Sequence, residues 1–147
     1  MSKFVMAFLS GTFFTFILDF FIFLGIKLHY IDFYGIDLYY NILFADNQSP
    51  LLYLVSSIIL GYITIYIDNN KLSTIVLGIL FFIVSLTLIE PIGNYVGKMI
   101  LMEKNVTFRD HKYTFTGDIY YNGRDTITFY DYELEKIIFL KKKDLKQ

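Results

Sequence analysis

Three long stretches of the chain carry almost no charge, and they constrain its fold more than any other feature. Residues 4–26 contain one charged side chain, Asp19, and residues 51–67 and 72–89 contain none. A helix that rises about 1.5 Å per residue crosses about 30 Å of hydrocarbon in roughly 20 residues. The first stretch reaches that length alone, and the other two reach it with flanking residues at the membrane surface. The sequence therefore predicts three transmembrane helices.

The charged residues gather in the last third of the chain. Residues 1–97 hold three of the 13 Lys and Arg residues and six of the 14 Asp and Glu residues, although they make up two thirds of the length. Overall 55% of the residues are hydrophobic and 18% are charged, against about a quarter charged in a soluble domain. A chain of 147 residues cannot bury that much apolar side chain in one core. The composition argues against a soluble enzyme and excludes a disordered chain, and it makes the lipid bilayer the first expected partner.

Turn and cap residues separate the three stretches. Ser49 and Pro50 form an N-cap and a first helical residue, so a helix is expected to begin there. The polar residues 68–71 form a short turn, which predicts that the second and third helices are antiparallel. Glu90 precedes Pro91, and proline disfavours helical geometry in the residue before it. The third helix is therefore expected to end or bend at this point.

The remainder of the chain is expected to form two further parts. Residues 91–103 stay fairly apolar, which fits either a helix lying at the membrane interface or a bent extension of the third span. This segment completes a transmembrane region of residues 1–103. Residues 104–147 are predicted to form a small antiparallel β-module of three to four strands with a basic tail. Asn122 and Gly123, flanked by β-prone residues, predict a hairpin with a type I′ turn.

The connection between the first two spans, residues 27–50, is unusually aromatic and acidic. Aromatic rings concentrate at the headgroup level of a membrane, so we expect a loop or short helix resting on the surface. The alternative is an acidic, aromatic surface for a partner. The His and Asp residues in it lack the spacing of a metal site, so no metal is predicted. The residues of this candidate interfacial or partner surface are His29, Tyr30, Asp32, Phe33, Tyr34, Asp37, Tyr39 and Tyr40.

Small residues recur at helical spacing within the three spans. Residues three, four or seven apart lie on one face of a helix, and small side chains on such a face let membrane helices approach closely. The simplest architecture turns all three stripes inward as a compact bundle. The expected packing residues are Gly11, Gly61, Gly78 and Ser85.

Asp19 is the one acid inside a predicted span. A carboxylate at membrane depth costs about 2.5–3.5 kcal/mol on insertion scales, so it usually faces a partner or water. We expect a structural role, with the carboxyl group held by Thr15, Ser57 or Thr64. The alternatives are a contact with a basic residue of another subunit and a proton or cation site. No second acid, His or Arg accompanies it in the spans, which disfavours an ion pathway.

Basic residues near the ends of the spans predict the orientation, because cytoplasmic segments carry an excess of Lys and Arg. Four of them lie on the side of the C-terminal module and two on the other side. The module is therefore expected to be cytoplasmic, in a protein of the cell (plasma or inner) membrane. The four are Lys27, Lys98, Lys104 and Arg109, and the two are Lys3 and Lys71.

The motifs of common enzyme classes are missing from the sequence. It contains no phosphate-binding loop, dinucleotide fingerprint, zincin helix or nucleophile elbow, and no cysteine. Basic residues form no face for nucleic acid. We expect no enzyme and no cofactor, but an accessory, assembly or scaffolding subunit that binds a membrane protein or a second copy. The alternative is an ion- or proton-handling component, possibly oligomeric, that uses Asp19. A membrane enzyme using His29, Asp32, Asp37 or Glu90 on a lipid-linked substrate is less favoured.

Overall fold

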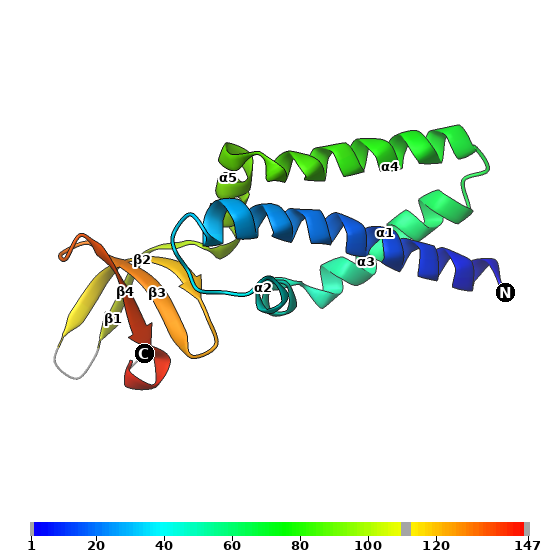
Figure 1. Ribbon diagram of the computed structural model, residues 1–147. Helices are drawn as coiled ribbons and strands as arrows, with labels where there is room; N and C mark the ends of the chain where they lie inside the picture. The colour runs from blue at the N-terminus through cyan, green and yellow to red at the C-terminus, as the bar shows by residue number, and fades with distance from the viewer. Residues whose placement is uncertain (1, 110–112, 146–147) are drawn as a thin grey trace.

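The computed structural model describes residues 2–109 and 113–145 and divides into a helical part and a β-sheet (Figure 1). The helical part is formed by the first two thirds of the chain. The sheet lies beyond the C-terminal end of the first helix, opposite the N-terminus. The α-helices are α1 (Lys3–Ile26), α2 (Tyr40–Asn47), α3 (Pro50–Ile65), α4 (Asn70–Ser85) and α5 (Glu90–Leu101).

The sheet is an antiparallel meander of four strands in the order β1-β2-β3-β4. The prediction of a small antiparallel module of three to four strands is therefore confirmed. One face of the sheet is covered by Ile119, Ile127 and Phe129, which are buried against one another. The strands are β1 (Glu103–Arg109), β2 (Thr114–Asn122), β3 (Thr126–Asp131) and β4 (Lys136–Lys141).

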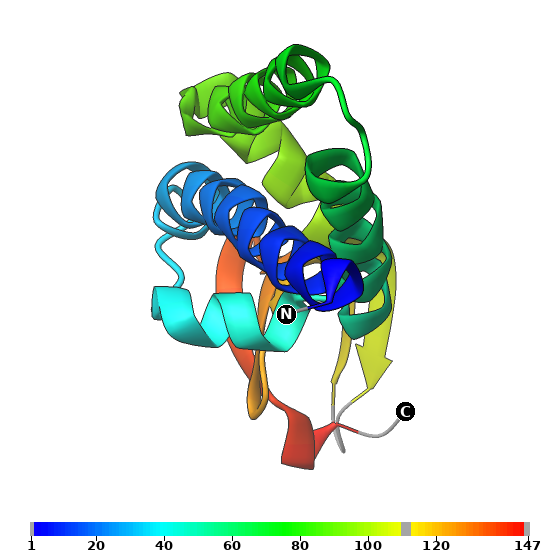
Figure 2. The ribbon, with the colours of Figure 1, turned by 90° about the vertical axis from the view of Figure 1, so that its right-hand side faces the viewer.

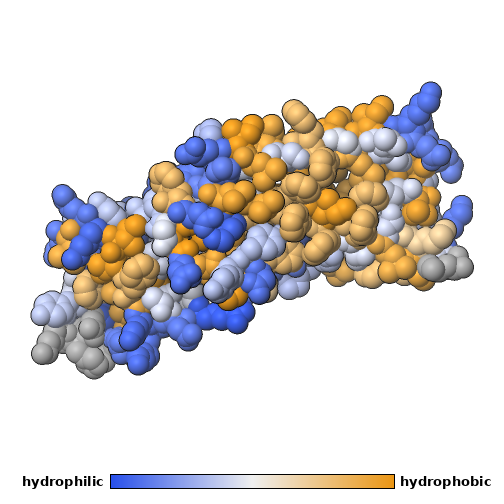
Figure 3. Space-filling model, viewed as in Figure 1, coloured by the Kyte–Doolittle hydropathy of each residue, from blue (hydrophilic) through white to orange (hydrophobic). Residues whose placement is uncertain are grey.

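Two continuous helices are long and apolar enough to cross a membrane. One runs over Lys3–Ile31 and consists of α1 with a π-helical turn at its end, and the other runs over Asn70–Leu88. A third candidate combines α2 and α3, which meet at an angle of 86°. Apolar side chains cover the surface of the helical part between two more polar ends (Figure 3). The described residues therefore contain two helices that are long and apolar enough to span a membrane, or three if α2 and α3 count as one span.

Local capping explains where α3 and α4 begin. The hydroxyl of Ser49 accepts a hydrogen bond from the Leu52 amide at 3.4 Å, and Pro50 occupies the first turn of α3. The side chain of Asn69 accepts from the amides of Lys71 and Leu72 at the start of α4. Such caps satisfy amide groups that have no partner within the helix. The chain thus turns between α3 and α4 at the polar residues where the sequence predicted a turn.

The end of α4 shows how proline redirects the chain. A 3₁₀ turn over Leu86–Leu88 follows α4, and Ile89 is extended before α5 begins at Glu90 with Pro91 in its first turn. Proline suits this position because its missing amide has no helical partner there. Figure 1 shows α5 turned away from the line of α4. The segment thus forms a helix of its own, α5, after a break at Ile89.

Glycines set the contact between α1 and α3. A Cβ atom on Gly11 would lie 1.8 Å from the carbonyl oxygen of Ser57, and one on Gly61 would lie 2.2 Å from that of Ala7. Only glycine permits so close an approach of two backbones. A Cβ atom on Gly78 would meet nothing within 4 Å, and the Ser85 hydroxyl donates to its own helix. The expected inward stripe therefore holds for α1 and α3 and not for α4.

Helices and sheet share one hydrophobic core at their junction. It forms where the end of α1, the π-helical turn, α2, α5 and strand β2 meet, and Figure 2 shows α2 lying crosswise to α1 there. Residues 27–50, which were expected to form a loop or a short helix on the membrane surface, are thus mostly helical and contribute to this core. The buried residues of this core are Phe23, Ile26, Tyr30, Ile31, Ile36, Leu43, Leu101 and Tyr121.

The hairpin between β2 and β3 has a different turn from the predicted one. A type I′ turn needs positive φ at both central residues, yet neither Asn122 nor Gly123 has a positive φ. Asn122 is still a strand residue, paired with Ile127, so the connection is longer than two residues. The Gly123 amide donates to the Thr126 carbonyl at 3.1 Å. A Cβ on Gly123 would lie 2.8 Å from that oxygen, so close approach and not left-handed backbone requires glycine.

Candidate functional site

The first attachment between the helical part and the sheet is made by Tyr30. Its side chain is fully buried, and its hydroxyl donates to the Tyr120 carbonyl oxygen in β2 at 2.7 Å. Helix α5 packs against the π-helical turn, Lys27–Ile31, that contains Tyr30. A Cβ on Gly97 would lie 2.4 Å from Tyr30, and the Asn94 amide donates to the His29 carbonyl at 2.8 Å. The π-helical turn is therefore held between α5 and the sheet.

Stacked tyrosine rings extend this attachment. The Tyr34 ring lies 4.3 Å from the Tyr120 ring between centroids, and the Tyr120 and Tyr130 rings are stacked at 5.9 Å. Burial, followed by the neighbouring tyrosines, raises the pKa of Tyr120 above its ordinary value. The stacked ring of Tyr120 thus contributes apolar contact between the sheet and the residues that follow the π-helical turn. Tyr30 and Tyr34, both predicted as surface residues, are in fact part of this internal contact.

The second attachment is an ion pair between the β2–β3 hairpin and α2. Arg124 donates from Nε to one carboxylate oxygen of Asp46 at 2.8 Å and from Nη2 to the other at 2.5 Å. This bidentate geometry adds specificity to the charge attraction. The bond to Asp46 raises the pKa of Arg124 further above its ordinary value. Sheet and helices are thus joined at two separate points.

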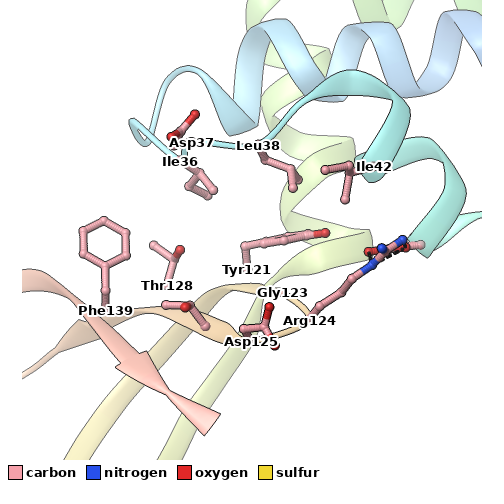
Figure 4. A pocket seen from close by; sticks show the side chains of 12 residues that line it. Ile36, Asp37, Leu38, Ile42, Tyr121, Gly123, Arg124, Asp125, Thr128 and Phe139 are labelled. Carbon is pink, nitrogen blue, oxygen red and sulfur yellow. Dashed lines mark hydrogen bonds and ion pairs between the residues drawn. The ribbon is translucent and has the colours of Figure 1, made fainter.

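A cavity of about 380 Å³ lies beside the second attachment (Figure 4). The residues that precede and enter α2 form its upper side, and one face of the sheet forms its floor. Apolar side chains line the upper side of the cavity, polar and apolar residues together line its floor, and charged side chains stand at its rim. Its lining residues are Ile36, Leu38 and Ile42 above, Tyr121, Gly123, Thr126, Thr128 and Phe139 below, and Asp37, Asp46, Arg124 and Asp125 at the rim.

The charge around this cavity is unbalanced. Three carboxylates stand against one guanidinium group, and that guanidinium is already bound to Asp46. Within residues 2–109 and 113–145 the ion pairs are Arg124 with Asp46 and Lys27 with Asp32. Asp37 and Asp125 therefore give the rim a negative field. Sequence reasoning singled out Asp37 and, as a turn residue, Gly123. It missed the other lining residues, because they come from segments far apart in the chain.

Asp19 has a different partner from those expected. One of its carboxylate oxygens accepts a hydrogen bond from the Gln48 side chain at 2.8 Å. Gln48 lies between α2 and α3, and the sharp bend there brings it beside α1. It was missed because it lies outside the apolar stretches, where no periodicity relates it to Asp19.

The predicted hydroxyl partners of Asp19 are used elsewhere. Ser57 donates to the Tyr53 carbonyl at 2.7 Å, and Thr64 donates to a carbonyl of its own helix at 2.9 Å. Hydroxyl groups in helices commonly bond to the carbonyl one turn earlier, and this local bond replaces the expected one. Thr15 is buried, and its hydroxyl has no partner among the residues that the structure describes.

The remaining residues of the aromatic segment do not converge on one point. The His29 ring lies 2.8 Å from the Leu88 carbonyl oxygen, and Asp32 is paired with Lys27. In the described part of the chain no three His, Asp or Glu side chains are grouped to hold a metal ion. The Tyr40 hydroxyl donates to the Phe20 carbonyl at 3.2 Å. Two rings stay exposed, Phe33 and Tyr39.

Comparison with known proteins gives no relative from which a function could be transferred. No family model matches the sequence, and no curated protein or solved structure is significantly similar to it. The functional argument therefore rests on the two attachments, the cavity beside the second of them and the apolar helices.

Proposed function

We propose that the chain is a small membrane protein with three spans that acts as a non-catalytic accessory, assembly or scaffolding subunit of a membrane complex. The observation that carries the proposal is the double attachment of the sheet, through Tyr30 to Tyr120 and through Arg124 to Asp46. A module on a loose linker samples many orientations, whereas two separated contacts hold one. The helices thus anchor a platform in a fixed orientation at the membrane surface.

The helix lengths support a position in a bilayer, because the apolar parts of α1, α3 and α4 are equally long. Helices α3 and α4 contain 16 residues each, about 24 Å at the standard rise. Lys3 and Asp19 are separated by 16 positions, so the same length of α1 lies between them. The bond from Gln48 places Asp19 level with the junction of α2 and α3. In this arrangement Asp19 lies near the headgroups, and α2 lies along the surface.

The lipid-facing side of α4 supports a partner within the membrane. An apolar groove of about 480 Å³ runs between α1 and α4, and Thr74 and Gly78 are part of its wall. Small residues at a spacing of four are typical of contacts between membrane helices. The side chains of α1 do not fill this groove, which leaves room for a transmembrane helix of a partner subunit. The partner is a membrane protein or a second copy of the chain.

Purification in mild detergent tests this proposal. We expect the chain to bring down a stoichiometric partner or to form a defined oligomer. A Tyr30→Phe and Arg124→Gln double variant, which loosens the platform, is expected to stay in the membrane and to retain less partner. A monodisperse single chain that brings down nothing would contradict the proposal.

One observation favours a second candidate, a proton- or cation-handling component. The partner of Asp19 is the neutral amide of Gln48, so no positive charge in that contact compensates the carboxylate. An oligomer would bring several such carboxylates together. The test is flux into reconstituted vesicles, which Asp19→Asn is expected to abolish under this alternative. Flux that is absent from the wild type or unchanged in the variant removes it.

A further inference from the structure

Helix α5 is apolar on the side that faces away from the protein as well as on the side that packs. On the packed side, Gly93 and Gly97 let the helix approach its neighbours closely. On the other side, Pro91, Tyr95 and Met99 follow one another at a spacing of four, so they form one row along the helix. All three are exposed, Tyr95 at 64% and Met99 at 69%. A helix on the surface of a soluble domain carries polar residues on this side.

The position of α5 suggests what covers the exposed row. The helix begins just after the candidate span Asn70–Leu88, which has 19 residues, about 28 Å at the standard rise. A bilayer has a hydrocarbon layer of about 30 Å. The Thr87 hydroxyl lies 3.1 Å from the Phe21 carbonyl oxygen of α1, so the end of this span is fixed against α1. Figure 1 shows α5 running across the direction of α1 and α4. In a bilayer spanned by these helices, α5 therefore lies along the surface.

A basic residue and an apolar hollow border the exposed row. The hollow has a volume of about 400 Å³ and lies between α5 and Phe33, whose ring is 62% exposed. Lys98 stands at its edge, and no carboxylate pairs with it in the ranges that the structure describes. A lysine beside apolar residues lays its stem along them and keeps its amine at the polar level. This combination matches the acyl chain and the phosphate of a phospholipid. The other residues of the hollow are Glu90, Pro91, Asn94 and Tyr95.

We propose that α5 is a lipid-binding helix that lies in the headgroup layer of the membrane. Tyr95 and Met99 contact the acyl chains, and the Lys98 amine contacts lipid phosphate groups. The inference rests on the proposed function, because it requires the long helices to span the bilayer, and it adds the lipid surface as the partner of α5. Met102 connects α5 directly to Glu103, the first residue of β1. Lipid contact at α5 therefore holds the beginning of the sheet at the membrane surface.

A single tryptophan tests the proposal, since the chain contains none. Tyr95→Trp places the fluorophore on α5, and the full chain is reconstituted into vesicles of phosphatidylcholine and phosphatidylglycerol. The acyl chains carry bromine, which quenches tryptophan on contact, either near the headgroup or near the methyl end. We expect strong quenching that is greater with bromine near the headgroup. An unquenched tryptophan would show that water or a protein covers α5 and would overturn the proposal. Greater quenching by bromine near the methyl end would also overturn it, because α5 would then lie inside the hydrocarbon.

Two further tryptophans separate this inference from the proposed function. Ile79→Trp lies in the middle of α4, where the side chain is 54% exposed, and is expected to be quenched most by bromine near the methyl end. Tyr113→Trp lies between β1 and β2 and is expected to stay unquenched. Quenching at Ile79→Trp without quenching at Tyr95→Trp would overturn the inference and leave the proposed function standing. Absence of quenching at both would contradict the spans themselves, and equal quenching at Tyr113→Trp and Tyr95→Trp would overturn a specific role of α5.

Substitutions beside the tryptophan test the two lipid contacts. Met99 is mostly exposed, so neither Met99→Glu nor Met99→Leu reaches the core. In the Tyr95→Trp chain, Met99→Glu is expected to lose most of the quenching, because a carboxylate is disfavoured among acyl chains, and Met99→Leu is expected to retain it. Lys98→Glu should reduce the quenching and Lys98→Arg should not, since phosphate attracts only the cation. Circular dichroism melting shows whether each variant is folded. Full quenching in a folded Met99→Glu or Lys98→Glu variant would contradict the corresponding contact.

Discussion

Gln48 donates a hydrogen bond of 2.8 Å to Asp19, the one carboxylate inside the first predicted span. The two residues are 29 positions apart, and the bend between α2 and α3 brings them together. Helix α2 ends at the residue before Gln48. It also carries Asp46, which binds Arg124 of the β2–β3 hairpin. Helix α2 therefore links the sheet to the spanning helix through two polar contacts only two residues apart.

Replacement of Gln48 by leucine is expected to destabilise the protein by about 1–3 kcal/mol, because it leaves a half-buried carboxylate without its donor. The measurement is thermal unfolding in detergent. Asp68→Asn, which changes an exposed carboxylate in the turn between α3 and α4, is the control and should have little effect. A Gln48→Leu variant as stable as the wild type would show that water satisfies Asp19.

Leucine in place of Gly61 is expected to separate α1 from α3. Because a Cβ there would lie 2.2 Å from the Ala7 carbonyl oxygen, the backbones must move, at a cost of at least about 1–3 kcal/mol. Gly78→Ala is the matched control, since nothing lies within 4 Å of its Cβ position. Alanine there should stabilise the isolated chain by up to about 1 kcal/mol through helix propensity. Unfolding in detergent measures both, and equal effects would contradict the proposed packing.

Tyr30→Phe tests the first attachment of the sheet. The variant keeps the ring and leaves the Tyr120 carbonyl without its donor, which is expected to cost about 0.5–1.5 kcal/mol. Hydrogen exchange should increase in β2 and in the π-helical turn. Tyr39→Phe, on an exposed ring of the same segment, should change neither quantity. Unchanged exchange in β2 after Tyr30→Phe would mean that the sheet is held elsewhere.

Local patterns in the sequence predict the helices and strands well and their contacts poorly. Uncharged runs and the caps Ser49 and Asn69 depend on neighbouring residues, so they are visible in the sequence. The bond from Tyr30 to Tyr120 joins residues 90 positions apart, and no periodicity relates them. The rings of Tyr30 and Tyr34 were expected on the membrane surface because aromatic residues are common there. Packing against the sheet buries the same apolar rings equally well.

The turn at Asn122 and Gly123 differs from its prediction for a related reason. Two-residue type I′ turns are favoured in isolated hairpins because their twist matches that of the strands. Here the loop is longer, and it carries Arg124 outward to Asp46 on α2. Local preference alone does not select this longer turn. It occurs together with the contact between Arg124 and Asp46 on α2.

The stability of the protein is expected to fall as the pH rises above about 10. Burial raises the pKa values of Tyr120 and Tyr121 above their ordinary value of 10.0. Above pH 10 the unfolded chain therefore loses protons that the folded chain retains, which favours unfolding. Melting by circular dichroism between pH 9 and 11, about one unit either side of the ordinary value, measures the slope. A Tyr120→Phe variant should show a shallower slope, and an identical slope would exclude this tyrosine as a cause.

Cysteine labelling tests the membrane crossing of α4 and the orientation of the protein together. The chain contains no cysteine, so Lys71→Cys and Lys143→Cys each introduce a single reactive thiol. The first lies at the start of α4, at the end of the helices away from the sheet, and the second lies in the module beyond β4. Because Lys and Arg favour the cytoplasmic side, a membrane-impermeant maleimide should label the first in intact cells and the second only after permeabilisation. The reverse pattern would invert the orientation, and labelling of both from one side would contradict a membrane crossing by α4.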